Sequence, residues 1–270
     1  MVKKILITGA GGRIGAALRA GLKGRYETIR LVDLQPIEDL EEGEEAVQAD
    51  ICDLQAVEDM IKGMDGVVHL AASVSARGWE TMFEPNFIGT YNIFEAARRQ
   101  GVRRIVYASS IHAHGFYRRE QKVAPDSPPR PDSIYGVSKV FGEALGRFYA
   151  DKHGMEVVGL RIASFQPKPT TVRHLGTWLS PRDCVELVDC SLQAKGIHFE
   201  VVYGVSANSR ELYTDPNRAN IGYIPLDNAE DYAAEILAAM KPEDEPEMER
   251  AFHGALYVPV GFSGDLSKIS

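Results

Sequence analysis

The sequence predicts an α/β fold of the Rossmann type, a doubly wound parallel sheet with a small C-terminal substrate-binding region. Three observations lead to this prediction. Short apolar runs alternate with segments of helical period, which is typical of a parallel sheet covered on both faces. A glycine-rich turn separates the first apolar run from the first helical segment. With 270 residues, of which 44% are hydrophobic, the chain can also bury one large core.

The elements follow one another along the first part of the chain. Residues 4–8 form a short apolar run that glycine ends, which indicates a buried strand before a helix. Asp53 is a suitable N-cap for the helix that we expect over residues 53–62. By the same reasoning we expect strands over 4–8, 29–33, 46–50, 66–71, 104–108 and 156–162, and helices over 12–22, 53–62, 81–99 and 134–152.

Prolines break this alternation after residue 164. Helical segments are still expected over 181–193 and 228–240, and a strand over 199–203. The prediction is therefore a dinucleotide-binding core over 1–164, with the helix 134–152 carrying catalytic groups. Residues 165–270 are expected to form a small substrate-binding region whose elements return to the core.

Composition excludes several classes of function. The net charge of −8 argues against a surface for nucleic acid or anionic membranes. No apolar run reaches the ~18 residues of a membrane-spanning helix. Cys52, Cys184 and Cys190 form no paired framework, which favours a reducing cytoplasm. The histidines show no metal-ligand spacing, so no metal is predicted.

The glycine-rich turn predicts a dinucleotide site. Gly9, Gly12 and Gly15 would allow a tight turn, close approach to a pyrophosphate and close packing of the helix. The helix N-terminus that includes Arg13 and Ile14 offers backbone N–H groups to the phosphates. Asp33, eighteen residues after Gly15, would accept hydrogen bonds from the ribose hydroxyls and repel a 2′-phosphate, which favours NAD over NADP. Later strand ends should complete this site with Leu34, Asp50, Ile51, Leu70, Ala71 and Ala72.

Tyr135 and Lys139 predict the catalytic centre. Four residues apart on a helix, they share one face. A phenol has a pKa near ~10, and a nearby ammonium lowers that pKa, so the pair could remove a hydroxyl proton. Ser110, at the end of a strand, could orient the substrate oxygen, although a strand-end hydroxyl can also be purely structural.

These motifs together resemble the extended short-chain dehydrogenases/reductases. The likeness rests on the turn Thr8–Gly15, on Ser109-Ser110 and on Tyr135-xxx-Lys139, and it spans roughly residues 3 to 235. The closer similarity is to uronate dehydrogenases, carried by residues 108–112, 131–139, 161–164 and 178–180 and by Arg173. The resemblance implies oxidation of a cyclic hexuronate at C1 by NAD, giving an aldarolactone and NADH, in a homo-oligomer.

The resemblance and the positions of the strand ends also suggest further contacts. Arg173 could bind a carboxylate with two parallel hydrogen bonds, and equally a phosphate. Asn86 is expected to brace the active-site strand. The resemblance places an aromatic near the substrate in the stretch that holds Tyr257, although a packing aromatic is the favoured expectation there. Cofactor contacts are further expected from Asn86, Ser109, Tyr135, Lys139, Ile162 and Ser164, and substrate contacts from Ser73, Ser75, Ser110, Ile111, His112, Tyr135 and Arg173.

One departure leaves the substrate open. Uronate dehydrogenases usually have Asn after the second serine, where it contacts the sugar, and this chain has Ile111. Another aldose or a sugar phosphate such as glucose 6-phosphate is therefore an alternative substrate. A nucleotide-sugar epimerase or dehydratase is a second alternative, which the short C-terminal region disfavours. A non-catalytic dinucleotide sensor is a third, which has no need of Ser110, Tyr135 and Lys139 together.

Overall fold

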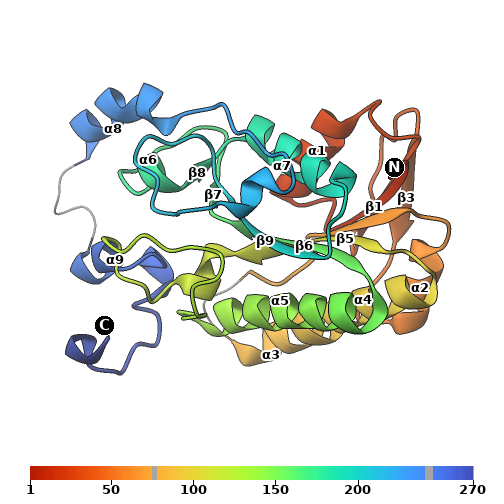
Figure 1. Ribbon diagram of the computed structural model, residues 1–270, viewed down its shortest axis with the longest axis horizontal. Coiled ribbons are helices and arrows are strands. Elements are labelled where there is room, and N and C mark those ends of the chain that lie inside the picture. Colours follow the sequence, from red (N-terminus) through yellow and green to blue (C-terminus); the bar gives the residue numbers. More distant parts are fainter. Residues whose placement is uncertain (75–77, 241–245, 270) are drawn as a thin grey trace.

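The computed structural model describes residues 1–74, 78–240 and 246–269. Within these ranges, the main sheet has seven strands in the order β3-β2-β1-β4-β5-β6-β9, and every neighbouring pair is parallel (Figure 1). This order reverses at β1, as in a doubly wound fold, so the predicted fold class is confirmed. The strands are β1 (Lys4–Thr8), β2 (Thr28–Asp33), β3 (Glu44–Gln48), β4 (Gly66–His69), β5 (Arg104–Ser110), β6 (Glu156–Ile162) and β9 (Phe199–Gly204).

Helices cover both faces of the sheet (Figure 1). On one face, α1 (Arg13–Leu22) packs against α7 (Pro181–Gln193) over a core that includes Leu18 and Val188. The other face carries α2 (Leu54–Ile61), α4 (Thr90–Arg99) and α5 (Ile134–His153). The strands between them are buried on both sides, which explains their continuous apolar runs.

Local capping sets the limits of two helices. The Asp53 side chain accepts hydrogen bonds from the backbone N–H groups of Gln55 and Ala56, as predicted for an N-cap. Ser133 accepts one from the backbone N–H of Gly136 and so starts α5, the helix that carries Tyr135 and Lys139. Gly154 ends α5 with a φ of 67°, in the left-handed region that glycine adopts easily.

Several predicted boundaries were wrong. The strand expected over 46–50 runs from Glu44 to Gln48, and its first two residues are glutamates paired with Arg19 and Arg30. Because β3 is an edge strand, it can carry charged side chains. Its first residues therefore form no apolar run that would mark the start of the strand. At the carboxyl edge, β4 ends two residues earlier than expected and β5 ends two residues later.

The long helix expected over 81–99 is divided. Helix α3 (Trp79–Met82) passes into a π-helical segment, Phe83–Gly89, before α4 begins. Pro85 lies in this segment and has no N–H group for a normal helical hydrogen bond. The widened turn places Asn86 beneath the loop that follows β4, where its side chain bonds to Ser73.

The C-terminal part of the chain forms smaller elements over the carboxyl edge of the sheet. The pair β7 (Ser164–Phe165) and β8 (Trp178–Leu179) flanks α6 (His174–Thr177), and α8 (Ala233–Ala239) lies outside them (Figure 1). After α9 (Glu247–Ala251), the backbone N–H groups of His253 and Gly254 donate to the carbonyls of Tyr117 and Gly115. This docking brings a segment of the C-terminal region back to the end of β5. The division at residue 164 stays a prediction.

No helix in the described ranges is both long and apolar enough to cross a membrane. In the same part of the chain, no cluster of histidine, cysteine, aspartate or glutamate side chains could hold a metal ion.

Candidate active site

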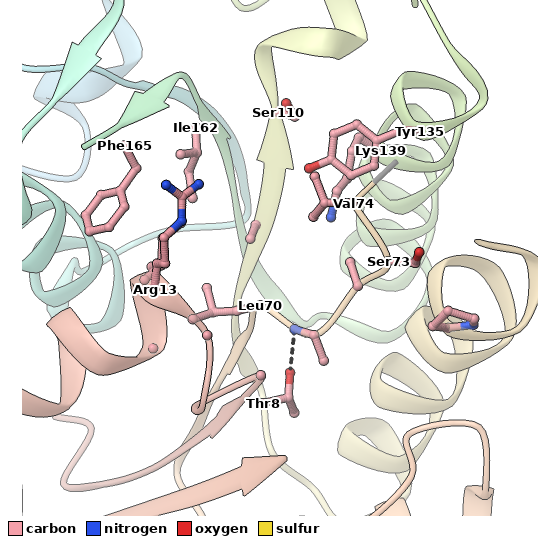
Figure 2. Close-up of a pocket in the computed structure, with 18 of the residues that line it drawn as sticks. Thr8, Arg13, Leu70, Ser73, Val74, Ser110, Tyr135, Lys139, Ile162 and Phe165 are labelled. Carbon is pink, nitrogen blue, oxygen red and sulfur yellow. Dashed lines mark hydrogen bonds between the residues drawn. The ribbon is translucent and has the colours of Figure 1, made fainter. Parts of the chain in front are cut away.

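A cavity of about 870 Å³ opens at the carboxyl ends of the parallel strands. The turns after β1, β2, β3 and β4 form one half of its wall. The ends of β5 and β6, the start of α5 and the C-terminal segment form the other half. Figure 2 shows Arg13 and Leu70 of the first half and Ser110, Tyr135 and Ile162 of the second. Ligands of doubly wound folds bind at this edge, where the strand order reverses.

The glycine turn closes tightly against its neighbours. Gly9 has a φ of 69°, and a Cβ at this position would lie 2.8 Å from the backbone nitrogen of Ala71. A Cβ at Gly15 would lie 2.5 Å from the carbonyl oxygen of Ala10. Thr8 supports the turn from below, since its hydroxyl accepts the backbone N–H of Ala71 at 3.2 Å (Figure 2). Glycine is therefore required at both positions for the turn and α1 to pack as they do.

This half of the cavity fits a dinucleotide. The first turn of α1 contains no acidic side chain, so its N-terminus faces the cavity with its partial positive charge intact. Arg13 extends from that turn toward Ile162 and Phe165 across the cavity (Figure 2). Asp33 accepts the backbone N–H of Gly11 at 2.9 Å, which holds its carboxylate at the end of β2. The cavity lining includes Gly9, Gly12, Arg13, Ile14, Gly15, Asp33, Leu34, Asp50, Ile51, Leu70, Ala71, Ala72, Ser109, Ile162 and Ser164 from the predicted cofactor site.

Tyr135, Lys139 and Ser110 come together in the middle of the cavity wall (Figure 2). The Lys139 Nζ lies 5.3 Å from the centroid of the Tyr135 ring and 5.2 Å from that of Tyr107. Both residues of the pair are buried, with 8% of Tyr135 and 4% of Lys139 exposed. The side chain of Ser110 accepts the backbone N–H of His112 at 3.3 Å, which orients the serine at the strand end.

Burial controls the protonation of this pair. It raises the pKa of the Tyr135 phenol above its ordinary value, and the hydrogen bond with Ser110 acts in the opposite direction. Burial also lowers the pKa of the Lys139 amine to about 7. The sequence led us to expect a lowered pKa for this tyrosine, and burial raises its pKa in this structure instead.

Arg173 lies across the cavity, at the start of α6. One terminal nitrogen of its guanidinium donates to the Ser164 Oγ at 2.9 Å, and the other donates to the carbonyl of His253 at 3.1 Å. Thr177 shares the Ser164 hydroxyl, with 2.9 Å between their oxygens. These bonds fix a planar cation in the cavity lining. A guanidinium carries five N–H groups, so it can keep these contacts and still bind a ligand oxygen.

The structure does not bring every predicted residue to the cavity. The side chain of Ile111 is buried among Val123, Tyr203 and Tyr213, away from the cavity lining. Asn86 also lies outside the lining and bonds to Ser73 and to the Ser138 hydroxyl, so it braces the loop after β4 against α5. Ser75 lies outside the described residues.

Ser109 has its side chain turned away from a ligand. Its hydroxyl donates to Glu143 at 2.5 Å, and Glu143 pairs with the buried Arg161 at 2.8 Å. Ser109 therefore touches the cavity mainly as a part of the strand, while its hydroxyl satisfies a buried carboxylate.

Sequence reasoning missed part of the wall. Tyr257 lines the cavity with its ring centroid 4.0 Å from that of His112, whereas a packing role was the favoured expectation and a place near the substrate the alternative. His174, Gln166 and Leu256 line it as well. No motif marks these positions, and only the docking of the C-terminal segment places Leu256 and Tyr257 here.

Comparisons with known proteins agree with this geometry. The sequence profile of the NAD dependent epimerase/dehydratase family matches residues 5–175. A uronate dehydrogenase of Pseudomonas putida is 37% identical over 96% of this chain and 96% of its own length. An NAD-dependent glucose-6-phosphate dehydrogenase of Haloferax volcanii is 36% identical over 87% of this chain and 97% of its own.

A solved structure of a relative has the same fold as this chain. The crystal structure of a mutant uronate dehydrogenase from Agrobacterium tumefaciens, complexed with NAD, is 40% identical and superimposes with a TM-score of 0.91. The superposition covers 96% of this chain and 97% of that one. The predicted resemblance to extended short-chain dehydrogenases/reductases, the NAD cofactor and the oxidoreductase class are confirmed. The chain belongs to the NAD dependent epimerase/dehydratase family.

Proposed function

We propose that the protein oxidises a cyclic hexuronate, glucuronate or galacturonate, at C1 and releases an aldarolactone. The observation that carries this proposal is the fixed guanidinium of Arg173 in the same cavity as Tyr135, Lys139 and Ser110. A cation there would bind the carboxylate of the sugar acid, while the tyrosine meets the hydroxyl at the other end of the ring. The relatives named uronate dehydrogenases support this reading.

In the proposed reaction, Tyr135 removes the proton of the anomeric hydroxyl. Ser110 donates a hydrogen bond to the same oxygen and holds it beside the phenol. Lys139 binds the nicotinamide ribose and stabilises the phenolate. NAD⁺, held by the cofactor half of the cavity, would supply the hydride acceptor for C1. His112, Ser73 and Arg173 would bind the remaining oxygens of the sugar.

The predicted cofactor residues would each bind one part of NAD. The turn from Gly9 to Gly15 and the start of α1 would hold the pyrophosphate. Asp33 would bind the adenosine ribose, and Asp50 and Ile51 would flank the adenine. The ends of β4 and β6, including Ile162 and Ser164, would surround the nicotinamide.

A sugar phosphate is the second candidate substrate. The planar fork of Arg173 suits a phosphate as well as a carboxylate, and Ile111 offers no amide to a sugar. The Haloferax relative is named for glucose 6-phosphate, which gives this candidate separate support.

The decisive experiment is a screen of NAD reduction with uronates, neutral aldoses and sugar phosphates at one concentration. We expect the highest kcat/KM with a hexuronate and an aldarolactone as the product. Activity on sugar phosphates alone would overturn the proposed substrate.

Tyr135→Phe tests the proposed base. The change removes only the hydroxyl, so we expect kcat to fall by at least about 1,000-fold while NADH binds with nearly unchanged affinity. Substantial dehydrogenase activity in this variant would contradict the assignment.

Exposed apolar side chains on α3 to α5 support a homo-oligomer. Phe83, Ile88, Tyr91, Val137 and Phe148 are between 39% and 50% exposed on these helices. We propose that these faces contact the same faces of a second copy of the chain, and a monomer in sedimentation analysis would exclude this homo-oligomer.

All three cysteines are free, which supports the predicted cytoplasmic location.

A further inference from the structure

A buried carboxylate lies behind the cavity wall, in contact with His112. The Nδ1 of His112 and the Oδ2 of Asp132 are 2.7 Å apart. The carboxylate of Asp132 is fully buried, and its other oxygen accepts the hydroxyl of Ser133 at 2.8 Å. Asp132 directly precedes Ser133, the residue that caps α5.

Two glycines leave the space that this carboxylate occupies. A Cβ at Gly115 or at Gly254 would collide with the Oδ2 of Asp132. Gly115 follows the end of β5, and Gly254 belongs to the docked C-terminal segment. The backbone N–H of Gly254 donates to the carbonyl of Gly115 at 2.9 Å, so the two glycines also hold each other. The carboxylate is thus fixed between two segments that are far apart in sequence.

This contact determines how the imidazole faces the cavity. A carboxylate can only accept, so Nδ1 must carry the proton and, in the neutral ring, Nε2 keeps its lone pair. His112 lines the cavity and Asp132 does not. Since the two nitrogens lie on different edges of the ring, Nε2 is on the edge away from Asp132. The ring centroid lies 4.0 Å from that of Tyr257 and 5.8 Å from that of Tyr135, and the two tyrosine centroids are 5.9 Å apart, so the three rings form one cluster.

We propose that Asp132 is a positioning residue for the substrate: it fixes His112 in the Nδ1–H tautomer, so that Nε2 accepts a hydrogen bond from a sugar hydroxyl. This inference rests on the proposed function for the identity of the substrate. Asp132 then orients His112 in addition to preceding the N-cap of α5. Gly115 and Gly254 leave the space that keeps its carboxylate within hydrogen-bond distance of the ring. The C-terminal segment then contributes to substrate binding through Gly254 as well as through Tyr257.

Asp132→Asn is the sharpest change, because an amide has nearly the same shape. The amide could keep its oxygen toward Ser133 and would then present N–H groups to Nδ1, which favours the opposite tautomer. Losing the hydrogen bond from the sugar to Nε2 should raise the KM for the hexuronate by about 10-fold, with a smaller change in kcat. The Kd for NADH should stay within about twofold, because no cofactor contact passes through Asp132.

A double-mutant cycle with His112→Ala separates positioning from packing. We expect Asp132→Asn to have no further effect on KM in the His112→Ala background. Equal effects of Asp132→Asn in both backgrounds would overturn the proposal. Asp183→Asn is the matched control: this carboxylate is also fully buried and binds the backbone N–H groups of Leu226 and Asp227, but it lies outside the cavity. It should lower Tm without changing KM.

A spectroscopic measurement on the wild-type protein tests the same point without any variant. Nitrogen-15 shifts of the His112 ring at alkaline pH should show the neutral Nδ1–H tautomer, and the neutral Nε2–H tautomer would overturn the proposal. If the wild-type protein oxidises no uronate, the proposed function fails, and the tautomer measurement still decides the role of Asp132. If the wild-type protein is active and the cycle is additive, only this inference fails.

Discussion

The two halves of the cavity are built in different ways. The cofactor half consists of strand ends and the short turns that follow them: Gly9–Gly15 after β1, Asp33 and Leu34 at the end of β2, and Asp50 and Ile51 shortly after β3. The substrate half joins segments that are far apart in sequence. Arg173 bonds to the carbonyl of His253, eighty residues later, and Tyr257 reaches His112 across a longer separation.

This difference determines what each half tolerates. In the cofactor half, backbone atoms form the site, and steric contacts restrict substitutions: a methyl group added at Gly9 or Gly15 would collide with a backbone nitrogen or carbonyl oxygen. In the substrate half, side chains make the site, and their limits are hydrogen bonds to other segments. We therefore expect substitutions in the first half to change NADH affinity, and those in the second half to change KM for the sugar.

Gly15→Ala should give the largest effect on the cofactor half. The new Cβ would lie 2.5 Å from the Ala10 carbonyl oxygen, so the turn or α1 must move. Overpacking of this kind costs up to about 3 kcal/mol, which corresponds to about 100-fold in the Kd for NADH. Fluorescence titration of NADH measures this change.

Gly159→Ala serves as its control. A Cβ at Gly159, on strand β6, meets nothing closer than 3.6 Å, and the residue does not line the cavity. Equal losses of NADH affinity in both variants would mean that the glycine turn has no special role.

Arg173→Ala should give the largest effect on the substrate half. Loss of charge-assisted hydrogen bonds to a carboxylate costs ~2 kcal/mol, so we expect the KM for a hexuronate to rise by about 30-fold. The KM for a neutral aldose should rise far less, and NADH affinity should be nearly unchanged. Steady-state kinetics with both sugars decide the matter, and equal losses on the two would argue against carboxylate binding.

The contrast between the halves also explains what the sequence could predict. The glycine turn, Asp33 and the pair Tyr135 and Lys139 were predictable because their requirements are local: a turn between strand and helix, a strand end, and one face of a helix.

The remaining parts of the site depend on contacts that no local pattern contains. The position of Tyr257 follows from the docking of Phe252 to Gly254 on residues 115–118, which sequence periodicity does not show. The side chain of Ile111 turns into the core because an apolar cluster accepts it. The pKa of Tyr135 is raised chiefly by burial, and burial is a property of the whole fold.

Asp33→Asn should give a smaller effect, confined to the cofactor half. An amide oxygen can still accept the Gly11 N–H, so the turn should keep its shape. Removing the negative charge reduces repulsion of a 2′-phosphate, and we expect the ratio of kcat/KM for NADP to that for NAD to rise by about 10-fold. Asp59→Asn, on α2 and outside the cavity, should leave this ratio unchanged. An unchanged ratio in Asp33→Asn would remove Asp33 from cofactor selection.

Lys139 lies where the two halves meet, and its burial makes the stability of the fold depend on pH. Burial lowers its pKa from an ordinary 10.5 to about 7, so between these values the unfolded chain binds a proton that the folded chain does not. The free energy of unfolding therefore decreases as pH falls from 10.5 toward 7, and below 7 it decreases no further on account of Lys139. Between these pH values, Lys139 contributes about 1.4 kcal/mol per pH unit to the slope of the unfolding free energy against pH.

Lys139→Met should remove this share without disturbing either half of the wall. Urea unfolding of the protein without added cofactor, at several pH values in that window, measures the slope in the wild type and the variant. Lys152→Met, at the exposed end of α5, should keep the wild-type slope. A wild-type slope in Lys139→Met would mean that the amine keeps its proton in the folded protein, and the phenolate of Tyr135 would then have an ammonium beside it even before the cofactor binds.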